Sequence, residues 1–145
     1  MDSGSAADAA PTYGVTVTID GVPKFFGYNV TAAPIQAWLN ISANDSTGAN
    51  GYWNISLTTP NTQSATQCLG SSYPSISYRH FASLNQPVPD QSFTSVQCVI
   101  IESTNAQAAG STAVGTFSGQ VSSPADAGSA VSHTLGSGSY DVIVQ

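Results

Sequence analysis

Apolar and polar residues alternate with a period of two along most of the chain, and no segment has the spacing of an amphipathic helix. Turn residues such as the Asp20–Gly21 pair separate the alternating runs, which recur about every 8–15 residues. This pattern predicts an all-β fold of eight to nine strands, an antiparallel β-sandwich or alternatively a flattened barrel. The clearest predicted strands are 13–19, 24–30, 35–42, 52–58, 75–81, 92–103, 112–121 and 139–144.

Three of these segments carry specific expectations. The run IQAWLNIS (35–42) predicts one continuous strand with Ile35, Ala37, Leu39 and Ile41 facing inward and Trp38 facing outward. The run at 92–103 is the longest apolar stretch, which predicts a central strand covered on both faces. Residues 59–72, by contrast, show no alternation and are predicted to be irregular.

The last two apolar runs are predicted to be neighbouring antiparallel strands, 114–121 and 140–144, joined by a loop over 122–138. Gly115 and Gly119 lie two positions before and after Phe117. Because glycine has no side chain, they leave room for a large neighbour such as Tyr140. The loop is rich in Ser, Ala and Gly, and its ionisable residues are Asp126 and His133. It is expected to be a mobile rim.

The 145 residues are sufficient for one domain with a real hydrophobic core. Residues 12–145 are predicted to form that domain. Residues 1–11 are small and polar, without apolar periodicity, and are predicted to be a flexible N-terminal tether. No segment has the roughly 20 apolar residues of a membrane-spanning helix.

The chain has two cysteines, Cys68 and Cys98. An even count in a chain of secreted character favours one disulfide, with two buried free thiols as the alternative. The bridge would close a loop of about 30 residues and stabilise the fold by roughly 3–4 kcal/mol.

Charged residues are scarce: Asp, Glu, Lys and Arg together make up 7% of the chain, whereas 22 serines and 14 threonines supply the polar surface. Such a hydroxyl-rich surface is commoner outside the cell, which favours an extracytoplasmic location in the periplasm or at the cell surface. The net charge is −6, and Lys24 and Arg79 are the only basic residues apart from histidine. Binding to nucleic acid or to anionic lipid needs clustered cations, so both functions are excluded. Membrane attachment is expected only through a possible N-terminal lipid anchor.

The segments VTVTIDGVPKFF near the start and GTFSGQV…LGSGSYDVIV at the end resemble a group of uncharacterised bacterial secreted proteins and lipoproteins. These proteins commonly open with a strand ending in Asp-Gly and close with two strands of this kind. The resemblance covers residues 13–145, but 59–91 fit it poorly. It implies a β-sandwich at the cell surface or in the periplasm, and it implies no activity.

No motif of an enzyme is present. The segment GTFSG does not have the spacing of a nucleophile elbow. His80 and His133 are interpreted as ordinary hydrogen-bonded histidines, and Asp20, Asp45 and Asp90 fit turns, where aspartate caps its own backbone. The loop NDSTGANG offers one carboxylate, too few for a calcium site. We therefore expect a protein that is not an enzyme and holds no cofactor or metal.

Aromatic residues are the better clue to function. Trp38 is predicted to face outward, and one of the adjacent pair Tyr52 and Trp53 must also face outward. Exposed aromatic rings flanked by amides stack on sugars, so Trp38 and Tyr52 are the candidate ligand-binding residues; burial of both faces of these strands is the alternative. The sequence thus predicts a non-catalytic, lipoprotein-like binding module for an unknown ligand, with a carbohydrate or another surface protein as the candidates. A carbohydrate-binding module and a subunit of an extracellular assembly built by strand addition are the alternatives.

Overall fold

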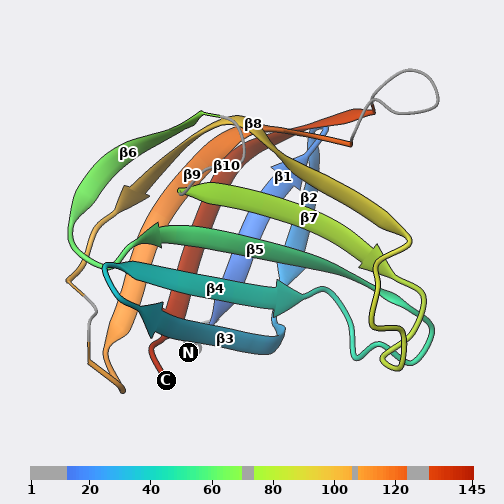
Figure 1. Cartoon of the computed structure of the whole chain (residues 1–145), viewed down its shortest axis with the longest axis horizontal. Helices are drawn as coiled ribbons and strands as arrows, with labels where there is room; N and C mark the ends of the chain where they lie inside the picture. Colours follow the sequence, from blue (N-terminus) through green and yellow to red (C-terminus); the bar gives the residue numbers. More distant parts are fainter. Residues whose placement is uncertain (1–12, 70–73, 106–107, 124–130) are drawn as a thin grey trace, which may run out of the picture.

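The computed structural model describes residues 13–69, 74–105, 108–123 and 131–145 (Figure 1). These ranges contain ten strands and no helix. The prediction of a tether at residues 1–11 lies outside the described residues. The strands are β1 (Gly14–Ile19), β2 (Val22–Phe26), β3 (Tyr28–Ile35), β4 (Trp38–Asn44), β5 (Tyr52–Pro60), β6 (Ser64–Leu69), β7 (Ser75–Phe81), β8 (Gln91–Glu102), β9 (Thr112–Ser122) and β10 (Ser132–Ile143).

All strands belong to one antiparallel sheet in the order β2-β1-β10-β9-β8-β7-β5-β4-β3, and β6 pairs with β8. The sheet curls until its last strand, β3, comes back to the end of β10 (Figure 1). There the Gln145 amide donates a hydrogen bond of 2.9 Å to the Ala32 carbonyl. The all-β prediction is therefore confirmed, and the arrangement is that of a nearly closed barrel.

The interior of the barrel is filled by one face of each strand. In β1, Val15, Val17 and Ile19 are buried while Thr16 is exposed, as period-two alternation requires. In β5, Ile55 and Leu57 are fully buried. The predicted strands at 13–19 and 52–58 are thus confirmed, and one side of each removes its apolar surface from water.

Three predicted segments before residue 75 are wrong in detail. The run 24–30 is divided between β2, which ends at Phe26, and β3, which begins at Tyr28. The run 35–42 is not one strand, because a turn at Gln36, with φ of +57°, separates β3 from β4. Ile35 is therefore 56% exposed, whereas Leu39 and Ile41 are buried as predicted. Residues 59–72 are not irregular throughout, because Ser64–Leu69 form β6 against β8. This strand is short of apolar residues, so hydrophobic alternation does not reveal it.

The predictions for the longest apolar run and for the last loop also need correction. In β8, Ile100 is buried but Val99 and Ile101 are about two-fifths exposed, so this strand is covered on one face and not on both. The loop predicted at 122–138 is shorter, because β10 already starts at Ser132. A bulge between Leu135 and Gly138 interrupts the alternation there and conceals the strand. Asp126 lies outside the described residues.

The C-terminal pair is confirmed. β9 and β10 are antiparallel neighbours, and Tyr140 lies directly opposite Gly115. A Cβ atom at Gly115 would come within 2.3 Å of the Tyr140 ring, so the missing side chain creates the space that the ring fills. The same relation holds between Phe117 and Gly138, which are also paired. Glycines therefore set the packing of both large rings.

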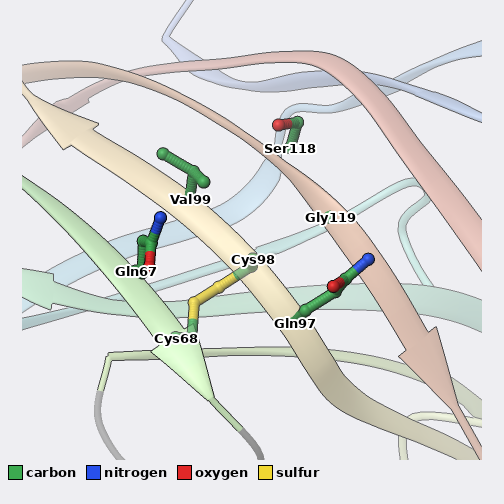
Figure 2. Close-up of a pocket in the computed structure, with 7 residues that line it drawn as sticks. All are labelled: Gln67, Cys68, Gln97, Cys98, Val99, Ser118 and Gly119. Carbon is green, nitrogen blue, oxygen red and sulfur yellow. A yellow bond between two sulfur atoms is a disulfide. The ribbon is translucent and has the colours of Figure 1, made fainter.

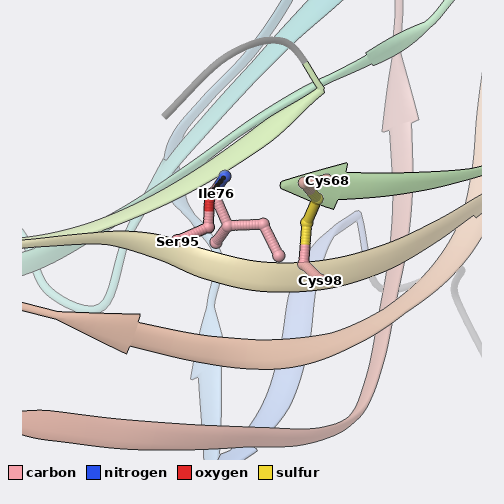
Figure 3. The surroundings of a disulfide bond; sticks show 4 residues. All are labelled: Cys68, Ile76, Ser95 and Cys98. Carbon is pink, nitrogen blue, oxygen red and sulfur yellow. Dashed lines mark hydrogen bonds between the residues drawn. A yellow bond between two sulfur atoms is a disulfide. The ribbon is translucent and has the colours of Figure 1, made fainter. Parts of the chain in front are cut away.

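Cys68 and Cys98 form the predicted disulfide, with Cα atoms 4.8 Å apart at directly opposite positions of β6 and β8 (Figure 3). β8 pairs with β7 through its first residues and with β6 through its last residues. At the fork between them, the backbone amide of Ile76 donates to the hydroxyl of Ser95 at 3.1 Å. The buried serine thus replaces a ladder bond where the two strands diverge.

Candidate functional site

Five rings gather at the end of the barrel where β5, β8 and β10 begin and β7 ends: Trp53, Tyr78, His80, Phe93 and His133, here called the end cluster. Trp53 stacks on Tyr78, with centroids 4.4 Å apart and planes 12° from parallel. The rings of His133 and Phe93 pack edge to face, with centroids 4.6 Å apart and planes at 81°. Tyr78 and Phe93 are each only 4% exposed, so they form the floor, and Trp53 and the two histidines form the partly exposed layer above it.

Both histidines are held by a carboxylate. Nδ1 of His80 lies 2.7 Å from Oδ1 of Asp90, and Nδ1 of His133 lies 2.7 Å from Oδ2 of Asp20. The imidazoles are about one-quarter exposed. A carboxylate at Nδ1 fixes the orientation of the ring and leaves Nε2 for another partner. The interpretation of both histidines as hydrogen-bonded residues is confirmed, although their partners are 10 and 113 residues away in sequence.

Asp20 is positioned by the turn that the sequence predicts. It and Gly21 have φ of +51° and +83°, as a tight hairpin between β1 and β2 requires. Its Oδ1 accepts the Thr134 amide at 2.9 Å, which ties this turn to β10. The hydrogen bonds from His133 and Thr134 lower the pKa of Asp20 below its ordinary value.

Asp45 meets the end cluster at Trp53. Its Oδ1 accepts the backbone amide of Trp53 at 2.8 Å, and its own amide donates to the Trp53 carbonyl at 3.0 Å. These two bonds hold the turn between β4 and β5 against the tryptophan. Burial, together with the charges of Asp45 and Asp20, raises the pKa of Tyr78 to about 12, so its hydroxyl remains protonated at neutral pH.

The end cluster offers flat rings together with groups that donate and accept hydrogen bonds. Within the described ranges, the side-chain hydrogen-bond partners of the two imidazoles are the carboxylates of Asp90 and Asp20. No three His, Cys, Asp or Glu side chains of the described residues converge as a metal ion would require. Stacking and hydrogen bonding are the chemistry that this arrangement supports.

The two sequence-predicted site residues do not meet. Trp38 on β4 lies opposite Pro60, at one end of β5, and Tyr52 lies at the other end of β5, opposite Phe81. The length of β5 from Tyr52 to Pro60 is about 26 Å at about 3.3 Å per residue. Both are half-buried on the outer face of the sheet. Alternation correctly places Tyr52 outward and Trp53 inward, but the inward residue is the one that joins the end cluster.

Two of the hollows on the outer face are lined entirely by described residues. One, of about 310 Å³, lies over the disulfide and is lined by Gln67, Cys68, Gln97, Cys98, Val99, Ser118 and Gly119 (Figure 2). The other, of about 380 Å³, shares Val99 and Ser118 and extends across β9 to β10. Neither contains an ionisable side chain, and Phe117 is the only aromatic residue in their walls. They provide less specific chemistry than the end cluster.

A buried carboxyl group lies at the opposite end of the barrel. Glu102 is 1% exposed, and its Oε1 accepts the hydroxyl of Tyr140 at 2.6 Å. Its Oε2 accepts the amide of Thr104 at 2.9 Å and also the hydroxyl of that residue. Because each carboxyl oxygen has a donor and neither faces water, we interpret Glu102 as a structural residue. Its position as the last residue of β8 gives no sign of its burial.

Comparison of the chain with protein-family models, with curated proteins and with solved structures finds no match. The resemblance to secreted proteins and lipoproteins therefore stays a prediction. Within the described ranges no helical segment has the length and hydropathy needed to cross a bilayer. The disulfide is typical of an oxidising, extracytoplasmic compartment.

Proposed function

We propose that this protein is a non-catalytic, lipoprotein-like binding module of the periplasm or cell surface, which holds a neutral saccharide at the end cluster. The observation that carries the proposal is the stack of Trp53 on Tyr78 beside two imidazoles, each fixed by its own carboxylate. An N-terminal lipid anchor at the tether is part of the same proposal.

The chemistry of a sugar matches that of the end cluster. The apolar C–H face of a pyranose packs on an aromatic ring, and its hydroxyl groups both donate and accept hydrogen bonds. The exposed layer supplies an indole together with imidazole Nε2 atoms, and Asp20 and Asp90 supply carboxylate oxygens. Fixed rings and fixed carboxylates lose little side-chain entropy on binding, which favours affinity.

A second candidate function is strand addition in an extracellular assembly. Among the described strands, β2 pairs only with β1 and β6 pairs only with β8, so each has one edge without a partner strand. Such edges accept an extended segment of another chain. The N-terminal strand itself is paired on both edges, with β2 and β10, which weighs against its donation to another copy.

Trp53 fluorescence tests the saccharide proposal. In a Trp38→Phe protein, Trp53 is the single tryptophan. We expect titration with a panel of neutral mono- and disaccharides to change its emission in a saturable manner, and Trp53→Leu to abolish the heat of binding measured by calorimetry in the otherwise natural protein. Tyr52→Leu, on the outer face, is the matched control and should bind as the natural protein does.

If no sugar of the panel binds, or if Tyr52→Leu and Trp53→Leu weaken binding equally, the end cluster is not the saccharide site. Light scattering over a range of protein concentrations separates the assembly function. A mass that rises steadily with concentration would favour strand addition, whereas a constant monomer mass with sugar binding supports the binding module.

A further inference from the structure

A second set of side chains lies on the outer face of β5 and β7: Tyr52, Asn54, Arg79 and Phe81, here called the Arg79 face. Tyr52 lies directly opposite Phe81, and Asn54 lies directly opposite Arg79. The rings of Tyr52 and Phe81 are stacked, with centroids 5.1 Å apart and planes at 14°. The guanidinium carbon of Arg79 lies 5.6 Å from the centre of the Phe81 ring. A cation thus lies against an aromatic pair.

Asn54 fixes the position of the guanidinium. Its Nδ2 donates to Oδ1 of Asn44 at 2.8 Å and to the hydroxyl of Ser42 at 2.9 Å, which determines the orientation of the amide. The Oδ1 of Asn54 therefore faces Arg79 and accepts a hydrogen bond from its Nη2 at 3.2 Å. Asn54 is only 6% exposed, so this support is rigid. The arginine is held in place before any ligand arrives.

The hydrogen-bonding capacity of Arg79 is mostly unused. Its Nε is buried without a hydrogen-bond partner in the described part of the chain. No carboxylate of the described residues lies within salt-bridge distance of its guanidinium, although acidic residues outnumber Lys and Arg by eight to two. Because Nε is buried, an external anion cannot reach it, and the donors open to a ligand are those of the terminal Nη atoms of this partly exposed residue. A guanidinium can bind a carboxylate through two parallel hydrogen bonds, and its two Nη atoms offer such a pair. A carboxylate from outside the chain is therefore a fitting partner.

We infer that the Arg79 face binds a saccharide carrying a carboxylate, such as a uronic acid, with Arg79 pairing with the carboxylate and Tyr52 packing against the sugar ring. A single guanidinium suits a single carboxylate and not a polyphosphate, which needs several cations. The neighbouring outward side chains are hydroxyl groups that match sugar hydroxyls: Ser56, Ser77, Ser92 and Thr94. The face is distinct from the end cluster, so the inference does not rest on the proposed function.

Calorimetric titration with digalacturonate tests the inference, with its neutral dimethyl ester, acetate and a short aspartate-containing peptide as comparisons. Lys24, the other basic residue, lies on β2 and provides a matched control, because Lys24→Gln and Arg79→Gln remove the same charge. We expect digalacturonate to bind the natural protein and Lys24→Gln with affinities within twofold of each other. Arg79→Gln should weaken binding at least tenfold. In a Trp53→Leu protein, whose end cluster no longer holds a neutral sugar, the dimethyl ester should bind at least tenfold more weakly than the acid.

Two further variants separate the roles of charge and ring. Arg79→Lys keeps the charge but not the planar fork, so its affinity should fall between those of the natural protein and Arg79→Gln; it also covers the case in which Arg79→Gln does not fold. Tyr52→Ala should weaken digalacturonate binding without changing that of acetate. The inference is overturned if digalacturonate does not bind, if both Gln variants weaken its binding equally, if the peptide binds as tightly as the acid, or if the ester does so in the Trp53→Leu protein.

Discussion

Replacing Tyr140 with phenylalanine removes one oxygen atom from the interior at the end of the barrel opposite the end cluster. Tyr140 and Glu102 are each 1% exposed, and the bond from the tyrosine hydroxyl to Oε1 is 2.6 Å long. Oε2 of the same carboxyl group already accepts from Thr104 and cannot compensate. The substitution therefore leaves a buried carboxyl oxygen without its donor, while the ring remains in the space beside Gly115.

The expected loss of stability follows from that geometry. A hydrogen bond to a carboxyl group contributes about 1.5–3 kcal/mol, and leaving a buried acceptor unsatisfied adds a desolvation cost of its own. No large cavity forms, because the phenyl ring is retained. We expect Tyr140→Phe to lower the free energy of unfolding by about 2–4 kcal/mol. Tyr28→Phe is the control, since that ring is 48% exposed, and should change stability by less than about 0.5 kcal/mol.

Urea denaturation at pH 7 measures both variants, and Glu102→Gln completes a double-mutant cycle with Tyr140→Phe. Because the two side chains share one hydrogen bond, their effects should not add, and the coupling should be at least about 1 kcal/mol. If Tyr140→Phe destabilises no more than Tyr28→Phe, or if the two interior substitutions add, the carboxyl group does not depend on the tyrosine and the packing at this end is different.

Three other outcomes are expected. Phe117→Ala should lower the free energy of unfolding by about 3–5 kcal/mol in urea denaturation, because the ring is only 4% exposed and fills the space above Gly138. A loss below about 1 kcal/mol would contradict the burial of this ring. Replacing both Cys68 and Cys98 with serine should lower the free energy of unfolding by roughly 3–4 kcal/mol in the same assay, because the bridge closes a loop of 30 residues. An unchanged midpoint would show that the bridge does not constrain the unfolded chain. The pKa of Tyr78 is raised to about 12, so the folded state holds its proton more tightly than the unfolded state. The contribution of Tyr78 to the free energy of unfolding should be constant below about pH 10 and fall between pH 10 and 12, by up to about 3 kcal/mol. Thermal denaturation over this range should show the fall, and Tyr78→Phe should flatten it.

Much of the candidate site is invisible to local pattern. The turn Asp20–Gly21 is predicted from two residues, yet nothing near it indicates that the carboxylate meets His133, 113 positions later. Alternation places Tyr52 and Trp53 on opposite faces of β5, but the neighbours that decide which ring joins a cluster come from β7 and β8. Partners on other strands depend on strand order, and order is not encoded in any single strand.

The sequence by itself determined the all-β class, the buried faces of β1 and β5, the disulfide, and the pairing of the last two strands. These follow from side-chain period, cysteine count and glycine positions, which are local properties of the chain. Only the tertiary structure decided that one sheet closes on itself, that Ser64–Leu69 add to β8, and that Glu102 is buried against Tyr140. Each of these features depends on which strands become neighbours. Strand order depends on how the apolar side chains of all the strands are buried together, which no single segment of the sequence shows.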